Sequence, residues 1–371
     1  MLVANVTPAQ VLEHFKGKKV FITGHTGFKG SWLSLLLSEA GALLKGYSLA
    51  PDHENSLYEN LEPHLNLESV IADIRNADKI KQEILSFQPD FIFHLAAQPL
   101  VRYSYAHPAE TFEVNVMGTV HVLEAIRDVS KKCTAVIITT DKVYENNEAG
   151  MPFKEQDKLG GHDPYSSSKA AAEIVVQSYQ KSFFPLQEWN SHLKAVATAR
   201  AGNVIGGGDR SADRIIPDLI KSLESGNTLQ VRNPDAVRPW QHVLDPLTGY
   251  LKLAFLLDSD AHKYSGSYNF GPNPEDQLSV REIVQLAISC WGTGNYETPQ
   301  KSKQPHEANH LRLDITKSIT QLHWKPQWNA KEAVERTVKW YGKSSQNLVN
   351  KKELCLIDIH SFINQNNFER N

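Results

Sequence analysis

Short apolar runs rich in Val and Ile alternate with longer amphipathic runs from Lys18 onward. Each such pair predicts a strand followed by a crossover helix, and repetition of that unit builds a parallel sheet. Several of the short runs are almost wholly apolar, as strands are when helices cover both faces of a sheet. We therefore predict an α/β fold with a doubly wound parallel sheet. The predicted strands cover residues 19–23, 43–49, 70–72, 91–95, 135–139 and 194–199, and the predicted helices cover 31–40, 77–87, 111–129 and 167–183.

The pattern changes after Arg200, where a glycine cluster and several prolines replace the regular repeat. This half predicts a smaller α/β domain, with a strand at 268–270 that returns to the first sheet and helices at 279–290 and 330–340. We expect the following division: 15–200 with a return segment at 241–270, then 201–240 with 271–343, and a tail at 344–371. The apolar run at 354–363 is expected to pack on the body or on a neighbouring molecule.

Three glycines stand where the first predicted strand turns into the first predicted helix. Glycine lets the backbone approach a ligand, and a helix N-terminus offers free N–H groups and a positive dipole end to a diphosphate. The arrangement predicts a Rossmann-type dinucleotide site. Its expected cofactor contacts are Gly24, Thr26, Gly27, Phe28, Lys29 and Gly30.

The end of the second predicted strand bears on the choice between NAD and NADP. An acidic residue that binds the adenosine ribose is expected there, about 20 residues after the glycines. Ser48, Leu49 and Ala50 stand at that position instead, and no arginine is there to meet a 2′-phosphate. The missing arginine favours NAD as the cofactor.

The composition argues against nucleic-acid, membrane and metal partners. The 371 residues carry a net charge of −3, with acidic and basic residues interspersed. Cys133, Cys290 and Cys355 are odd in number and far apart, which argues against a disulfide framework and favours a reducing cytoplasm. Because neither an HExxH or CxxC pattern nor a signal peptide is present, we expect a cytoplasmic protein without a metal site.

Tyr165 and Lys169 form a YxxxK pattern at the start of a predicted helix. A spacing of four places both side chains on one helix face. A tyrosine has a pKa of about 10, so it acts as a base at neutral pH only where a nearby cation favours the phenolate. Lys169 and the charge of the nicotinamide would supply that cation, which predicts a tyrosine base at this position.

The chain resembles the extended short-chain dehydrogenases up to about residue 340, through its glycine loop and its YxxxK pattern. In that resemblance Thr140 is the hydroxyl partner of the tyrosine. Residues 140–144, Thr-Asp-Lys-Val-Tyr, narrow the family, since sugar-nucleotide 4,6-dehydratases carry Asp after the threonine whereas the epimerases carry small residues. The Asp-Lys pair, with the segments 24–33, 96–105 and 160–173, is similar to the dehydratases that act on CDP-glucose.

The resemblance implies further ligand contacts. It implies that NAD also contacts Asp73, Ile74, Leu95, Ala96, Ala97, Thr139, Tyr165 and Lys169. It implies that the smaller domain binds the sugar nucleotide, with contacts from Gln98, Arg102, Asn203, Arg214, Arg238, Trp240 and His242. Arginine suits a diphosphate because its planar fork donates two bonds to paired oxygens. Trp240 either stacks on the substrate or packs in the core.

The implied reaction needs more than a tyrosine and a lysine. After oxidation at C4, a base removes the C5 proton and an acid protonates the leaving C6 hydroxyl, before hydride returns to C6. Asp141 is the expected acid and Lys142 the expected base, which requires burial or a neighbouring cation to lower the pKa of Lys142. Adjacent strand residues point to opposite faces, so both reach the sugar only if the backbone leaves strand geometry at Thr140.

Other hypotheses stay open from the sequence. They are a 4,6-dehydratase for GDP-mannose or dTDP-glucose, a nucleotide-sugar 4-epimerase, and a non-catalytic NAD-sensing module, which the intact Thr140, Tyr165 and Lys169 disfavour. The resemblance also implies a role in deoxysugar and lipopolysaccharide O-antigen biosynthesis. It further implies a homodimer in which the helices at 111–129 and 167–183 form a four-helix bundle across a two-fold axis. A purely internal core would explain the same apolar residues.

Overall fold

Seven parallel strands form the central sheet, in the order β11-β6-β5-β4-β1-β2-β3. The computed structural model describes residues 6–146, 150–276, 278–299, 311–346 and 348–365. The strand order reverses between β1 and β4, which is where open α/β sheets bind ligands. The predicted fold class is confirmed. The strands are β1 (Lys19–Thr23), β2 (Leu43–Ser48), β3 (Leu67–Ile71), β4 (Phe91–His94), β5 (Cys133–Ile138), β6 (Lys194–Ala201) and β11 (Gly266–Phe270).

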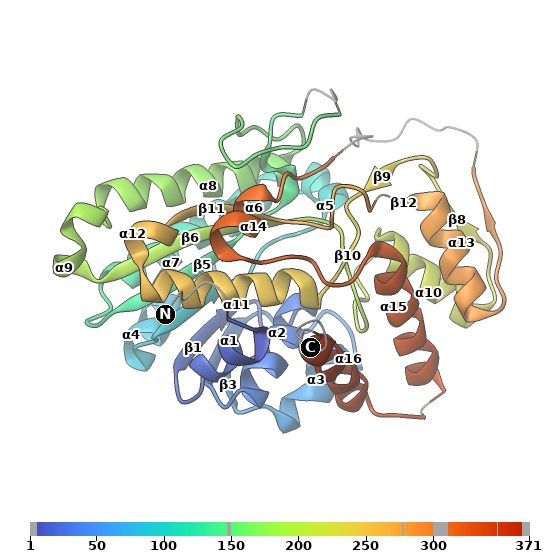
Figure 1. Cartoon of the computed structure of the whole chain (residues 1–371), viewed down its shortest axis with the longest axis horizontal. Coiled ribbons are helices and arrows are strands. Elements are labelled where there is room, and N and C mark those ends of the chain that lie inside the picture. Colours follow the sequence, from blue (N-terminus) through green and yellow to red (C-terminus); the bar gives the residue numbers. More distant parts are fainter. Residues whose placement is uncertain (1–5, 147–149, 277, 300–310, 347, 366–371) are drawn as a thin grey trace.

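Helices cover both faces of this sheet (Figure 1). Successive strand residues face opposite sides, so Val20 and Ile22 join one apolar cluster whereas Phe21 joins the other. The cluster around Phe21 includes side chains of α4 (Ala77–Phe87), α7 (Gly118–Arg127) and α8 (Pro164–Ser182). The cluster around Val20 includes side chains of α1 (Pro8–His14), α2 (Phe28–Glu39) and α11 (Leu244–Ser259).

α11 is a helix that the sequence pattern did not predict. Nearly all of its side chains are buried, including polar Asp245, Thr248 and Lys252. A helix buried on every side lacks the apolar stripe by which helices are recognised in sequence. β3 begins three residues before its predicted start, because it is an edge strand whose first half mixes Glu68 and Ser69 with apolar residues.

The predicted helix at 111–129 is interrupted. It consists of α6 (Pro108–Phe112), a π-helical turn η3 (Glu113–Met117) and α7. Asn115 in this turn is buried, where its amide accepts from the backbone N–H of Gln98 at 2.8 Å and donates to Ser168 Oγ at 2.8 Å. The turn therefore ties the loop after β4 to helix α8, and π-turns of this kind are frequent at functional sites.

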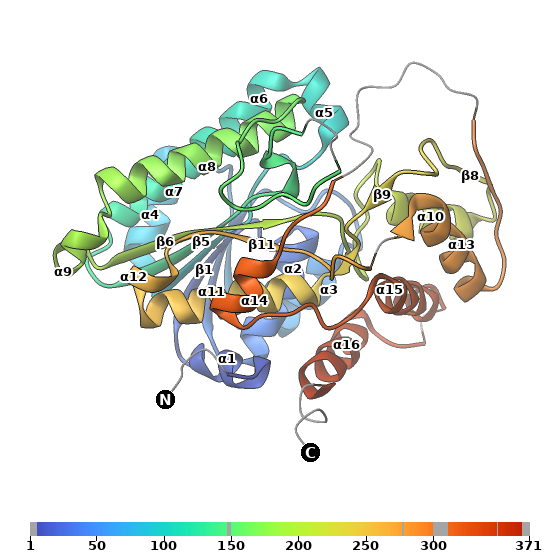
Figure 2. The same cartoon turned by 45° about the horizontal axis from the view of Figure 1, so that its top comes forward.

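The second half of the chain builds a smaller region beside the carboxyl ends of the strands (Figures 1 and 2). Its main helices are α10 (Ile215–Ser225), α13 (Val280–Trp291) and α15 (Ala330–Ser345). Three short strand pairs join its segments: β7 (Val204–Ile205) with β10 (Gln241–His242), β9 (Val237–Arg238) with β12 (Leu278–Ser279), and β8 (Leu229–Gln230) with β13 (Tyr296–Glu297). The exact domain boundaries stay a prediction.

The C-terminal segment packs on the body as helix α16 (Lys351–Gln365). Its Leu354, Ile359 and Phe362 are buried, and Trp328 Nε1 donates to Gln365 Oε1 at 2.6 Å. Residues 366–371 of the predicted tail lie outside the described part of the chain. The remaining short elements are α3 (Leu57–Leu61), η2 (Glu62–His64), α5 (Val101–Ala106), η4 (Asp141–Val143), η5 (Leu186–Glu188), α9 (Trp189–His192), α12 (Ala261–Tyr264) and α14 (Thr316–Leu322). Among the described helices, none has the length and apolarity to cross a membrane.

Candidate active site

The glycine loop joins β1 to the N-terminus of α2, as predicted. Gly24 has φ +77°, and a Cβ at this residue would lie 2.7 Å from the backbone N of Ala96, so the loop packs against the chain after β4. A Cβ at Gly30 would collide with the carbonyl oxygen of Gly24. No side chain caps the helix at Gly27, whose surface is exposed. The first N–H groups of α2 are therefore not covered by a side chain. Such a helix end fits a diphosphate.

Hydroxyl groups occupy the end of β2, where an acidic residue usually binds the ribose. Thr26 Oγ1 lies 2.8 Å from Ser48 Oγ and donates to the carbonyl oxygen of Leu49 at 2.9 Å. Asp73, two residues after the end of β3, binds Arg75 at 2.6 Å, and this bond holds the pKa of Asp73 below its usual value. Thr26 and Ser48 thus place hydroxyl groups at the strand end where the ribose is expected.

The backbone leaves strand geometry after β5, as the expected roles of Asp141 and Lys142 require. β5 ends at Ile138, and Thr140 is the N-cap of the 3₁₀ turn η4, accepting from the backbone N–H of Lys142 at 3.4 Å. Thr140 Oγ1 donates to Asp141 Oδ1 at 3.0 Å. The turn lets Thr140, Asp141 and Lys142 all line one cavity.

The first turn of α8 carries Tyr165 and Lys169. Lys169 Nζ donates to the carbonyl oxygen of Ile138 at 2.9 Å, and burial lowers the pKa of Lys169 to about 8. Burial raises the pKa of Tyr165 to about 12, although a hydrogen bond with Thr140 opposes the shift. The protein alone therefore favours the neutral phenol, and the prediction of a phenolate continues to depend on the nicotinamide charge together with Lys169.

Asp141 and Lys142 differ in their surroundings. Asp141 is fully buried against Gly202, and its Oδ2 has no hydrogen-bond partner in the described structure. The Lys142 side chain is 27% exposed, and its Nζ lies 3.9 Å from Asp141 Oδ1. Lys142 therefore lies at the cavity wall beside a carboxylate and keeps part of its surface in solvent.

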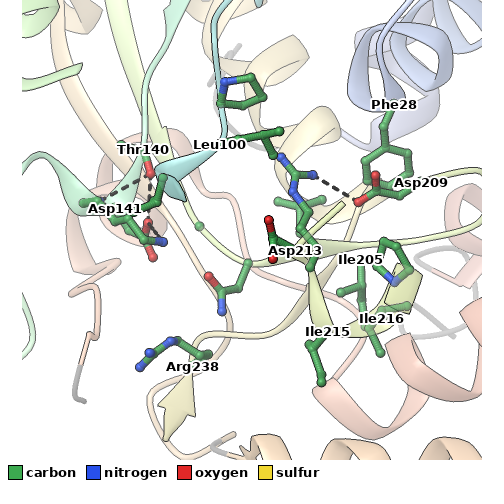
Figure 3. Close-up of a pocket in the computed structure, with 18 of the residues that line it drawn as sticks. Phe28, Leu100, Thr140, Asp141, Ile205, Asp209, Asp213, Ile215, Ile216 and Arg238 are labelled. Carbon is green, nitrogen blue, oxygen red and sulfur yellow. Dashed lines mark hydrogen bonds and ion pairs between the residues drawn. The ribbon is translucent and has the colours of Figure 1, made fainter. Parts of the chain in front are cut away.

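The cavity encloses about 360 Å³ between the sheet and the smaller region. Figure 3 shows Thr140 and Asp141 on one side, Phe28 and Asp209 on the other, and Arg238 reaching in from β9. Arg214 binds Asp209 at 3.0 Å and Arg232 binds Asp213 at 3.2 Å. The arginines that line the cavity are Arg102, Arg214, Arg232 and Arg238. Such a group of guanidinium ions suits a diphosphate.

Most predicted site residues line this cavity. They are Phe28, Lys29, Leu95, Ala97, Arg102, Thr139, Thr140, Asp141, Lys142, Tyr165, Lys169, Asn203, Arg214, Arg238 and Trp240. The rest of the glycine loop, with Asp73, Ile74 and Ala96, lies outside the lining. Sequence reasoning missed Arg232, which only the packing of the smaller region brings to the cavity, and did not select Asp209, although the segment at 200–209 resembles one that leads to a sugar-nucleotide pocket.

Gln98 and His242 are predicted substrate contacts that the structure does not bring to the cavity lining. Gln98 Nε2 donates to Thr111 Oγ1 at 2.9 Å, so its side chain holds the loop after β4. His242 is fully buried against Trp32 and Trp328, and burial lowers its pKa to about 3. Trp240 lines the cavity, but most of its side chain is buried. Its Nε1 donates to the carbonyl oxygen of Leu278 at 2.9 Å.

A tyrosine, a lysine and a threonine beside a glycine-lined helix N-terminus place the chain among the extended short-chain dehydrogenases. A family model described as GDP-mannose 4,6 dehydratase matches residues 21–337, and the chain belongs to this family. Both the predicted family and the predicted enzyme class, a nucleotide-sugar dehydratase, are confirmed.

Known proteins resemble the chain over most of its length. It is 46% identical over 327 residues to a CDP-glucose 4,6-dehydratase of Salmonella typhimurium. The aligned region covers 88% of this chain and 91% of the relative. The structure of a dTDP-glucose 4,6-dehydratase from Bacillus anthracis in complex with NAD matches with TM-score 0.72 at 23% identity, over 89% of this chain and 98% of that one. A UDP-glucose 4-epimerase from Thermotoga maritima matches with TM-score 0.75 at 20% identity, over 88% and 99%. These two structures share the fold.

Proposed function

We propose that this enzyme converts CDP-glucose to CDP-4-keto-6-deoxyglucose with NAD as a recycled cofactor. The observation that carries the proposal is the turn at Thr140–Lys142, which adds a buried carboxyl group and an amine to the tyrosine and lysine pair around one cavity. An epimerase needs only the tyrosine, the lysine and the hydroxyl, whereas a dehydratase needs a further acid and base. The 46% identity to a CDP-glucose 4,6-dehydratase supports the choice of nucleotide.

The residues present fit NAD. Gly24 and Gly30 close the loop tightly, while Gly27 leaves the N-terminus of α2 open to the diphosphate. The hydroxyls of Thr26 and Ser48 lie where the adenosine ribose is expected, and no arginine stands at that strand end to receive a 2′-phosphate. When bound, NAD accepts a hydride from C4 of the sugar and returns it to C6.

Tyr165 takes the proton of the C4 hydroxyl in the oxidation step. The pKa of Tyr165 lies well above neutrality in the protein. The positive charges of Lys169 and of the nicotinamide must therefore stabilise the phenolate when NAD is bound. Lys169 is the nearest cation on its helix face, and it is held by the carbonyl oxygen of Ile138. Thr140 holds the reacting oxygen, which it reaches from the end of β5.

Asp141 and Lys142 serve the elimination step. The C4 ketone acidifies the C5–H bond, so that Lys142 removes the proton while Asp141 gives a proton to the departing C6 hydroxyl. Asp141 is buried with one oxygen unpartnered in the described structure, and the residue lines the cavity beside Thr140 and Lys142. The arginines that line the cavity, and Arg238 in particular, bind the diphosphate of the substrate.

The decisive experiment offers CDP-, dTDP-, GDP- and UDP-hexoses to the enzyme without added reductant. We expect a 4-keto-6-deoxy product from CDP-glucose, with no net consumption of NADH. Tyr165→Phe is the matched control, since it should bind the nucleotide sugar and form no product. Preference for dTDP-glucose or GDP-mannose would correct the nucleotide, and an epimerised hexose without loss of water would replace the proposal by a 4-epimerase.

The same proposal includes a cytoplasmic homodimer that takes part in deoxysugar and O-antigen biosynthesis. Large apolar side chains are exposed along α6, η3 and α8, among them Phe112, Met117 and Ile174, the last 56% exposed. Pairing of these helices across a two-fold axis would bury them in a four-helix bundle. Light scattering should give twice the mass of the chain, and Ile174→Glu should shift it toward the monomer.

A further inference from the structure

Lys29 is a predicted cofactor residue of the glycine loop that lines the active-site cavity. It occupies the first turn of α2, directly after Phe28, and lines the cavity together with Asp141 and Lys169. A cation in the first turn of a helix meets the positive end of the helix dipole, which is unfavourable. Its position therefore calls for an explanation other than helix stability.

The Lys29 amine has no polar partner among the residues that the structure describes. Within the part of the chain that the structure describes, it makes no hydrogen bond or ion pair, and its nearest aromatic contact is the Tyr250 ring, whose centroid lies 5.9 Å from Nζ. Burial, together with the positive charges of Arg214 and Lys169, lowers the pKa of Lys29 to about 7. The amine is thus poised between its charged and neutral forms at physiological pH.

The path of the cofactor places its reactive ring near this amine. Under the proposed function, on which this inference rests, the diphosphate binds at the N-terminus of α2, beside Lys29. The hydride leaves C4 of the sugar and the proton leaves the hydroxyl group on that carbon, so the nicotinamide must lie beside Tyr165 and hence near Lys169 and Asp141. Lys29 connects these two points, because it lies in the first turn of α2 and lines the same cavity as Lys169 and Asp141.

We propose that Lys29 tunes the redox balance of the bound nicotinamide, with its ammonium form disfavouring the cationic NAD⁺ relative to the neutral-ring NADH. Two like charges a few ångströms apart shift an equilibrium at least ~10-fold at the effective dielectric constant of a protein. Weaker binding of the oxidised form makes NAD⁺ the stronger oxidant in the site. Lys29 thereby favours the hydride transfer from C4, and its protonation is coupled to the redox state.

Other charged groups face the same space and must be separated from Lys29 in any test. Tyr165 and Lys169 come from α8, Asp141 from η4 and Tyr250 from α11. Asp209 and Arg214 come from the loop before α10. Lys169 also titrates in the accessible range, with a pKa of about 8. Because Lys169 stays in every variant below, the difference between native enzyme and variant isolates Lys29.

The test is an equilibrium measurement that needs no turnover. The dissociation constants of NAD⁺ and NADH are measured by fluorescence and calorimetry at pH 6.0 and pH 8.5, for the native enzyme, Lys29→Met and Lys29→Arg. We expect the ratio of the NAD⁺ constant to the NADH constant to fall about tenfold in Lys29→Met at pH 6.0. At pH 8.5, where the native amine is neutral, the two proteins should converge. Lys29→Arg should keep the high ratio at both pH values, since its charge does not titrate.

Lys158→Met is the matched control, because it removes one lysine charge at an exposed ion pair with Glu145. It should leave the ratio unchanged. An unchanged ratio in Lys29→Met, or equal weakening of NAD⁺ and NADH, would overturn the redox role and leave only a binding contact. A native chain that binds neither nucleotide would instead contradict the proposed function itself, and with it this inference.

Discussion

The carboxylate of Glu173 and the guanidinium of Arg200 form an ion pair of 2.8 Å in which both side chains are fully buried. Glu173 lies one helical turn after Lys169, and its Oε1 accepts from Thr139, the residue before Thr140, at 2.6 Å. Arg200 also donates to the Tyr144 hydroxyl at 2.8 Å. One buried network therefore fixes α8, β5 and β6 relative to one another, and with them the active-site lysine and threonine.

Glu173→Gln should lower the free energy of unfolding by about 3–5 kcal/mol, because it leaves the Arg200 charge buried without a counter-ion. Urea denaturation followed by circular dichroism measures this loss. The double variant Glu173→Gln with Arg200→Met should regain part of it, since it removes both charges. A single variant as stable as the native enzyme would mean that the polar groups around Arg200 suffice to hold its charge.

Lys142→Met should trap the reaction between oxidation and elimination. Oxidation at C4 needs Tyr165, Lys169 and Thr140 but no base at C5, so enzyme-bound NADH should accumulate in a single turnover. Deuterium exchange at C5 of recovered substrate should slow about 10²–10⁴-fold, the range for a positioned acid–base group. In Asp141→Asn the exchange should persist while C6 hydroxyl loss is slow. Native-rate exchange in Lys142→Met would assign the base to another group.

Arg238→Ala should weaken binding of the sugar nucleotide and spare binding of NAD. Arg238 lies on β9 in the smaller region, is largely buried and lines the cavity far along the chain from the glycine loop. Loss of one buried charge-assisted partner costs roughly 2–5 kcal/mol of binding free energy. Calorimetry with each ligand separates the two effects, and equal weakening of both would indicate a folding defect.

Asp245 should make the enzyme less stable as pH rises. Burial raises the pKa of this carboxyl from 3.8 to about 8, and its Oδ2 has no partner in the described structure. The folded state thus binds more protons than the unfolded state between about pH 4 and pH 8, so the stability contributed by this group falls across that window. Asp245→Asn should raise the melting temperature at pH 8.5 more than at pH 5.

Asp258→Asn is the opposite case and serves as the control for that measurement. Hydrogen bonds to His14 and Lys132 hold the pKa of Asp258 at about 2, against the effect of burial. Its stabilising contribution is present above about pH 4 and is lost as pH falls toward 2. The variant should therefore be less stable than the native enzyme at both pH 5 and pH 8.5, by a similar amount.

Local spacing in the sequence was enough for the glycine loop, for Tyr165 with Lys169, and for the alternation of strands and helices. Each of these depends on residues a few positions apart, whose relative placement follows from strand or helix geometry. The same reasoning did not predict α11, because this helix is buried on all sides and its sequence lacks the periodic contrast between apolar and polar residues.

Tertiary structure alone decided which polar residues are buried and which meet in the cavity. Lys29 and Lys142 are both partly exposed lysines in predicted site motifs, yet burial and the cations Arg214 and Lys169 lower the pKa of Lys29, whereas Lys142 lies 3.9 Å from the Asp141 carboxylate. His242 shares a segment with Arg238, but lies in the core between tryptophans instead of at the cavity. Burial and electrostatic neighbours depend on segments more than a hundred residues apart, and sequence spacing carries no information about distances of that kind.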